Sequence, residues 1–195
     1  TGTYRESDAA TVRVLVHRRP GTDVSYAPSG LAHAEYATYA AEMVAEMLFE
    51  AHHRVGVSTL GDGSDVRLPS SGEDHRLALR RLFAAIDGAG TKRPDPTAVA
   101  DELVETLPNH TQYTLISPIQ DDSIVDLATR LSAYDRSVVV LSPRQPRAET
   151  DGQQILLADR ALRIDDLRRS GVTVLDWDTT EPLRMALEHR FGGAV

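Results

Sequence analysis

The feature that most constrains this chain is a set of short β-branched apolar runs, the clearest of which shows no alternation of apolar and polar residues. Thr11–Val16 reads TVRVLV and Ser137–Ser142 reads SVVVLS. A strand with one face in water alternates, whereas a strand covered on both faces is continuously apolar. The runs therefore predict strands of a parallel sheet with helices on both of its faces.

Segments with helical spacing stand between these runs and predict the order β-α-β-β-α-α-β-α-β-α-β-α. Asp62-Gly63 is a typical two-residue hairpin turn, so Arg54–Leu60 and Asp65–Leu68 are predicted to pair antiparallel at an edge. Right-handed crossovers join the other strands. We expect an α/β fold, a doubly wound and mostly parallel six-stranded sheet with one antiparallel edge strand, in one domain over residues 1–195.

Capping residues place the predicted helices. Ser29 precedes the first helix, Ser71 and Asp74 stand at capping-box spacing, and Asp95-Pro96 pairs a cap with a proline in the first turn. Asp121-Asp122 opens a further helix. The C-terminal third is predicted as a polar loop, a helix, a strand and a last helix, at Arg144–Gly152, Leu157–Arg169, Val172–Leu175 and Thr180–Phe191 respectively.

The composition fits a globular domain and excludes several classes. Apolar residues make up 41% of the 195 residues, and no run approaches the roughly 20 apolar residues of a membrane-spanning helix. The absence of cysteine excludes disulfides and thiolate metal sites. The sequence begins at Thr1 without a signal-like segment, so we expect a fragment of a longer protein, whose membrane anchor can lie outside it.

The charge balance argues against a nucleic-acid binder, which needs a basic face. The net charge is −8, with 29 acidic and 21 basic residues, and Lys92 is the only lysine. Aspartate is the more frequent acid, with 18 of the 29. Few lysines and a hydrated acidic surface are typical of a halophilic protein in a salt-rich cytoplasm. A GC-rich genome is the alternative reason for the arginine bias.

In open parallel sheets, ligands bind beyond the carboxyl ends of the strands. Three loops are predicted to meet there: those after Val16, around Thr91 and after Ser117. The sequence contains no glycine-rich phosphate loop and no nucleophile elbow.

Four segments of the chain, taken in the order in which they occur, resemble the von Willebrand factor A domain. More narrowly, they resemble the C-terminal half of the bacterial and archaeal family called domain of unknown function 58. The resemblance covers nearly the whole chain and includes a first strand at the centre of the sheet. It rests on Leu31–Asp62, Arg76–Phe83, Leu115–Asp122 and Leu167–Leu187.

Domains of this kind often carry a metal-ion-dependent adhesion site with Asp-x-Ser-x-Ser after the first strand, a threonine, and an aspartate after the fourth strand. In this sequence His17 stands at the aspartate position of the first motif, and Arg19 and Gly21 stand at its two serine positions. Pro118 replaces the aspartate after the fourth strand, although Thr91 can still be the threonine. Mg²⁺ prefers carboxylate and hydroxyl oxygens, and arginines repel it. The resemblance therefore implies a degenerate site, without metal or cofactor.

Two alternatives stay open. A displaced cation site, and with it cation-dependent adhesion, would use Asp23, Ser25, Thr91 and Asp121. Asp176 and Asp178 also fit the Asp-x-Asp-x-Thr motif of haloacid-dehalogenase-like phosphoryl-transfer enzymes, in which the first aspartate is the nucleophile and the second a general acid. The simpler reading is that Asp178 or Thr179 caps the last helix.

The leading hypothesis is a non-catalytic protein-interaction domain. The resemblance implies a membrane-anchored protein that acts with a MoxR-type AAA+ ATPase. We expect the domain in the cytoplasm, and the charge balance predicts no binding to nucleic acid. Loops at the carboxyl ends of strands can vary without disturbing the core, so the contact face is predicted there. Arg18 and Arg19 would bind carboxylates of the partner, or pair with acidic residues of their own domain. The predicted contact residues are His17, Arg18, Arg19, Asp23, Ser25, Thr91, Pro118 and Asp121.

Overall fold

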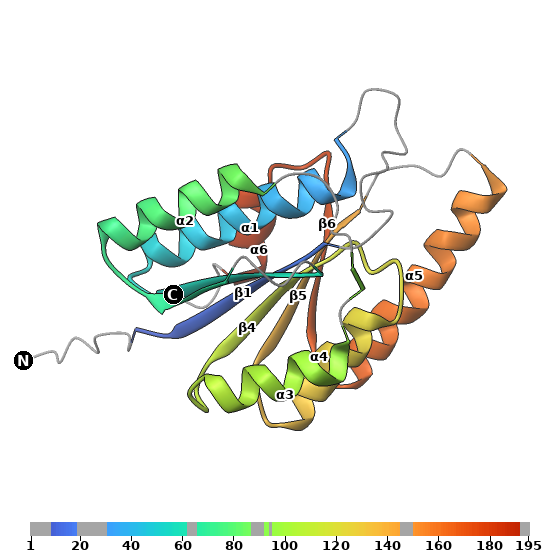
Figure 1. The fold of residues 1–195 in the computed structure, drawn as a ribbon. Coiled ribbons are helices and arrows are strands. Elements are labelled where there is room, and N and C mark those ends of the chain that lie inside the picture. Colours follow the sequence, from blue (N-terminus) through green and yellow to red (C-terminus); the bar gives the residue numbers. More distant parts are fainter. Residues whose placement is uncertain are drawn as a thin grey trace, which may run out of the picture.

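A computed structural model of the chain describes residues 9–18, 31–61, 66–86, 92–93, 95–144 and 150–191, with side chains up to 188. It confirms the predicted fold class: a six-stranded sheet in the order β3-β2-β1-β4-β5-β6, parallel except for the edge strand β3 (Figure 1). The strands are β1 (Thr11–His17), β2 (Arg54–Leu60), β3 (Val66–Ser70), β4 (Gln112–Ile116), β5 (Val138–Arg144) and β6 (Thr173–Asp178).

Helices cover both faces of the sheet (Figure 1). One layer consists of α1 (His33–Glu50), α2 (Glu73–Ala85) and α6 (Leu183–Phe191). The other consists of α3 (Pro96–Thr106), α4 (Ser123–Ala133) and α5 (Asp151–Arg169).

The central position of β1, between β2 and β4, is also confirmed. Because side chains alternate along a strand, Val14 and Val16 pack into the α1 layer while Leu15 packs into the α4 layer. Each fully buried side chain of this kind stabilises the fold by about 1.5–3 kcal/mol relative to its exposed state. Both faces of β1 are buried, which explains why apolar residues occupy successive positions at its end, Val14 to Val16.

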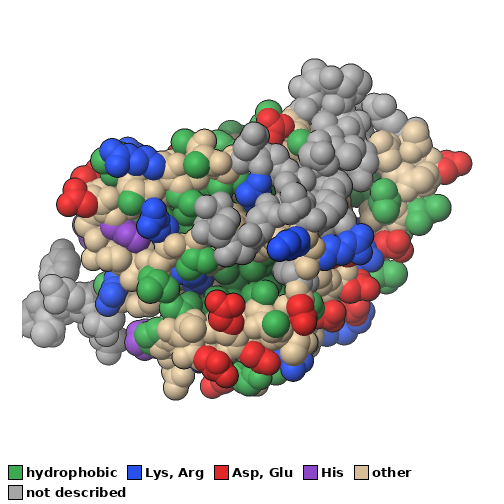
Figure 2. Space-filling model, viewed as in Figure 1, with side chains coloured by type: hydrophobic (Ala, Val, Ile, Leu, Met, Phe, Trp, Pro, Cys, Tyr) green, Lys and Arg blue, Asp and Glu red, His purple; other side chains and the backbone are tan. Residues whose placement is uncertain are grey.

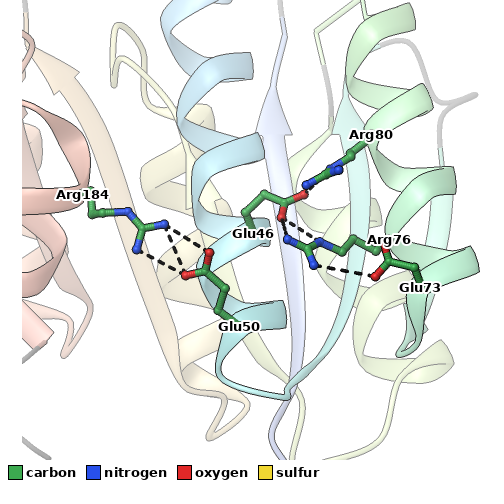
Figure 3. A network of polar contacts seen from close by, with 6 residues as sticks. All are labelled: Glu46, Glu50, Glu73, Arg76, Arg80 and Arg184. Carbon is green, nitrogen blue, oxygen red and sulfur yellow. Dashed lines mark hydrogen bonds and ion pairs between the residues drawn. The ribbon is translucent and has the colours of Figure 1, made fainter.

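Ion pairs join the helices of the α1 layer (Figure 3). Glu46 of α1 accepts hydrogen bonds from Arg76 Nε at 2.8 Å and Arg80 Nε at 2.7 Å, both on α2. Four residues further along α1, Glu50 pairs with Arg184 of α6 at 3.3 Å. Burial alone raises the pKa of Glu46, but the hydrogen bonds from Arg80 and Arg76 outweigh it and leave the pKa below its usual value.

The helix starts agree only in part with the sequence analysis. Asp95 caps α3 as predicted, its carboxylate accepting from Thr97 N at 2.9 Å. The predicted capping box at Ser71 and Asp74 is wrong, because α2 follows Gly72, whose positive φ turns the chain there. α1 begins at His33, and the predicted cap Ser29 lies outside the described residues, as does the hairpin turn Asp62-Gly63.

The C-terminal third shows the largest differences. α5 begins at Asp151, six residues before the predicted start, so the end of the predicted loop Arg144–Gly152 is helical. β6 extends to Asp178, and α6 begins at Leu183 instead of Thr180. The Asp178 carboxylate accepts from Thr180 N at 3.0 Å and thus forms a turn ahead of α6 instead of capping the helix.

Candidate functional site

A row of polar side chains crosses the sheet where four adjacent parallel strands end. His17 ends β1, Ser117 follows β4, Ser142 lies near the end of β5 and Asp176 near the end of β6. The strand register places them side by side on the face covered by α4 and α5. The carboxyl edge of the sheet, where a site was expected, therefore carries a continuous polar line.

The first half of this row is a buried histidine–serine pair. His17 Nδ1 lies 2.9 Å from Ser117 Oγ, and the two residues are 1% and 0% exposed. The Ser117 hydroxyl oxygen also accepts a hydrogen bond from Ile119 N at 3.1 Å. Ile119 has a φ of 53°, an unfavourable region for a β-branched residue, and this bond helps to hold the turn. His17 and Ser117 are thus engaged with each other within the protein.

The second half of the row is tied to α5. The Arg160 guanidinium donates from Nη2 to Ser142 Oγ at 2.8 Å and to Asp176 Oδ1 at 2.6 Å. Arg160 is 9% exposed, and a buried guanidinium of this kind needs a carboxylate partner to offset its desolvation. The pair anchors the middle of α5 to the ends of β5 and β6.

Asp178, the second acid of the Asp-x-Asp-x-Thr motif, lies in a different environment. Hydrogen bonds from the Thr180 hydroxyl and then the Thr180 backbone, with the nearby Arg144, hold the pKa of its carboxyl below the usual value. A general acid needs the opposite shift, toward the working pH. With Asp176 bound by Arg160, this geometry favours structural roles for both aspartates.

The structure places four of the eight predicted contact residues. His17 and Pro118 are buried, and Asp121 is half-buried, with Oδ1 accepting from Ser123 N at 3.1 Å where α4 begins. Arg18 is 6% exposed, and its backbone N–H donates to Leu60 O at 2.8 Å. Arg19, Asp23, Ser25 and Thr91 lie outside the described residues.

Gly61 shows how closely the chain packs beside Arg18. Its φ is 125°, and a Cβ there would lie 1.9 Å from the carbonyl oxygen of Arg18. Only glycine fits this position, so the close approach of the two backbones is built into the sequence.

Within the described ranges, no three His, Asp or Glu side chains gather in a way that could hold a metal ion. The displaced cation site includes Asp23, Ser25 and Thr91, which the structure does not describe. That site therefore stays a prediction.

Several exposed apolar side chains lie on α5, two of them just before and two within the predicted helix Leu157–Arg169. The first half of this helix extends away from the sheet (Figure 1). Ile155 and Leu162 are 63% and 62% exposed, and Leu156 and Leu157 are also exposed. Figure 2 shows apolar side chains on this end of the helix. We call these four residues the α5 apolar surface.

A sequence signal for this helix start existed. Thr150 and Gln153 form a capping box: Gln153 N donates to Thr150 Oγ1 at 3.3 Å, and Thr150 N donates to the Gln153 side chain at 3.1 Å. The Thr-x-x-Gln spacing directly before an apolar run could have placed the start correctly.

Comparison with known proteins adds little to this picture. No protein-family model and no curated protein matches the chain. A solved structure described as an uncharacterized membrane spanning protein from Vibrio fischeri matches with a TM-score of 0.33 and 11% identity, over 96% of this chain and 98% of that one. In the described part of the chain, no helix has the length and apolar character needed to cross a bilayer.

Proposed function

We propose that this chain is a non-catalytic protein-interaction domain of the von Willebrand factor A-like type, and that the α5 apolar surface is part of its contact area. The supporting observation is the exposure of Ile155 and Leu162 on a helix that projects from the domain. Exposed groups of large apolar side chains are typical of protein-binding surfaces. α5 begins at the carboxyl end of the sheet, the end at which the contact face was predicted.

The charges beside the α5 apolar surface indicate which charge the partner's surface should carry. Asp151 and Asp159 are exposed on the same half of α5, and the whole chain carries a net charge of −8. The partner therefore presents an apolar patch with basic side chains at its rim. The resemblance suggests a MoxR-type AAA+ ATPase as this partner, and the acidic, lysine-poor composition suggests a salt-rich cytoplasm.

The polar row is compatible with an interaction role that needs no catalysis. His17 is paired with Ser117, and Asp176 is bound by Arg160, so these side chains hold strand ends and α5 in place. A rigid base of this kind fixes the direction in which α5 projects.

The test uses the purified domain and a purified MoxR-type ATPase from the same organism. The double substitution Ile155→Glu with Leu162→Glu adds charge to the α5 apolar surface. Leu77→Glu with Met185→Glu is the matched control, because those side chains are 45% and 48% exposed on α2 and α6, in the opposite helix layer. Affinity measured at several salt concentrations should fall at least tenfold for the α5 variant alone, since buried apolar contacts dominate protein interfaces.

Equal binding by both variants would place the contact elsewhere on the domain, and no binding by the unaltered domain would refute this partner. Charge reversal of Arg18 is less informative, because Arg18 is buried and its replacement would destabilise the fold. A melting temperature that rises with millimolar Mg²⁺ at fixed ionic strength would instead favour the displaced cation site.

A further inference from the structure

A pocket of about 370 Å³ lies at the β3 edge of the sheet, opposite the β6 edge near α5. It opens between α3 and the strands β1, β2 and β3. In Figure 2 the surface is hollowed above α3, and apolar side chains form much of the hollow. The volume is at the small end of the roughly 300–1,000 Å³ typical of ligand pockets. The apolar walls include Leu15, Leu60, Val66, Val99, Leu103 and Leu107.

The pocket contains a buried arginine, an unusual residue for the middle of a central strand. Arg13 is 3% exposed; its guanidinium donates to the Ser58 hydroxyl and to the carbonyl oxygen of Arg67 at 2.5 Å. None of the ion pairs between described residues includes Arg13, and its Nε has no hydrogen-bond partner there. Burial lowers the pKa of Arg13 to about 10, although Tyr113 and Glu102 oppose that shift.

The charges that line the pocket differ from those of the chain as a whole. Arg13, Lys92 and Arg93 line it, and Glu102 is the one carboxylate among the described lining residues. The chain has a net charge of −8, so the excess of basic side chains among the described lining residues is opposite in sign to the charge of the whole chain. A pocket with this balance attracts anions, because recessed walls focus the local field.

We propose that this pocket binds a small monocarboxylic acid, with the apolar body between α3 and the sheet and the carboxylate next to the Arg13 guanidinium. A carboxylate would give Arg13 a direct ionic partner in a charge-assisted hydrogen bond, whereas Glu102 acts on it only at longer range. The apolar walls and the presence of Glu102 disfavour a phosphate dianion. This proposal is independent of the proposed interaction role, because α5 forms no part of the pocket.

Lys92 provides a specific probe, since it is the only lysine in the chain and lines the pocket. Reductive methylation with ¹³C-formaldehyde labels Lys92 and the N-terminal amine, which give separate NMR signals. Titration with 3-phenylpropanoate should shift the Lys92 signal in a saturable way. The matched alcohol, 3-phenylpropan-1-ol, should bind at least tenfold more weakly, because it cannot pair with Arg13. Equal effects of acid and alcohol, or no saturable shift with the acid, would overturn the proposal.

A pair of tryptophan variants separates the pocket from other surfaces. Val99→Trp fills the pocket from α3, and Val125→Trp places the same side chain at a similarly half-buried position on α4. The first variant should weaken acid binding at least tenfold, and the second should leave it unchanged. These sites leave Arg13 and its contacts to β2 and β3 in place. If Val99→Trp binds the acid as tightly as the unaltered domain, the pocket is not the site.

Discussion

The helices α4 and α5 pack on the same face of the sheet, yet they use their apolar residues in different ways. α4 buries Ile124, Leu127, Ala128 and Leu131, which follow the i, i+3, i+4, i+7 spacing of one helix face. α5 is longer, with 19 residues, but among its described residues only Arg160, Ile164 and Leu167 are buried. Its largest apolar side chains in the first half face solvent.

The comparison separates the apolar side chains that the core needs from those that it does not need. The apolar pattern of α4 follows from its place in the core, since each buried side chain contributes to stability. α5 is held by two ion pairs, Arg160 with Asp176 at 2.6 Å and Arg163 with Asp122 at 2.7 Å, by the hydrogen bond of Arg160 to Ser142, and by the apolar contacts of its last turns. Ile155 and Leu162 contribute little to this attachment, which is consistent with the contact role proposed for the α5 apolar surface.

The largest expected effect tests this contrast directly. Leu127→Ala in α4 should lower the free energy of unfolding by about 2–5 kcal/mol, because it leaves a cavity in a closely packed core. Leu162→Ala in α5 should change it by less than about 0.5 kcal/mol, because that side chain is 62% exposed. Urea unfolding of the two variants measures both values. Similar losses would show that α5 is part of the core.

The polar attachment of α5 gives a smaller effect. Asp176→Ala should cost about 1–3 kcal/mol, because Arg160 would keep its burial and lose its carboxylate. Asp122→Ala is the control, since its carboxylate is 75% exposed, and should cost at most about 1 kcal/mol. Thermal and urea unfolding can compare the two, and equal costs would mean that Arg160 does not anchor the helix.

Hydrogen exchange should resolve the two halves of α5 without any substitution. Backbone amides near Leu156 should exchange faster than those near Leu167, which is fully buried, and faster than those of α4. Binding of a partner to the α5 apolar surface should slow exchange between Ile155 and Leu162 and leave the last turns unchanged. Uniform protection along α5 in the free domain would contradict the contrast drawn here.

The smallest expected effect concerns the opposite helix layer, where ion pairs supplement apolar packing. The pKa of Glu46 is lower in the folded state than in the unfolded chain, so its contribution to stability is present above the unfolded pKa of roughly 4.3. That contribution is lost as the pH falls through the lower, folded pKa. Glu46→Gln should therefore reduce stability at neutral pH and flatten its decline below about pH 4.3. An unchanged pH profile would show that Arg76 and Arg80 do not stabilise the charged form.

The sequence predicted the sheet better than it predicted the site. Buried strands and a capped helix such as the one after Asp95 carry local signals, which is why their type and order were correct. The bond between His17 and Ser117 joins residues 100 positions apart, and the contact of Arg160 with Asp176 depends on how α5 crosses β5. No local pattern encodes such pairings. The α5 start was missed because polar residues precede its apolar run.

The central place of β1 also has a consequence for how the chain folds. β1 can pair with β2 once Leu60 has left the ribosome, but its other neighbour, β4, ends only at Ile116. Until then one edge of this buried central strand has no partner, and unpaired strand edges favour aggregation. Parallel pairing over such sequence separations is intrinsically slow, because a long loop must close before the contacts form. In the early chain α1 and β2 can therefore cover one face and one edge of β1, while the edge that later pairs with β4 stays open until the second half is synthesised.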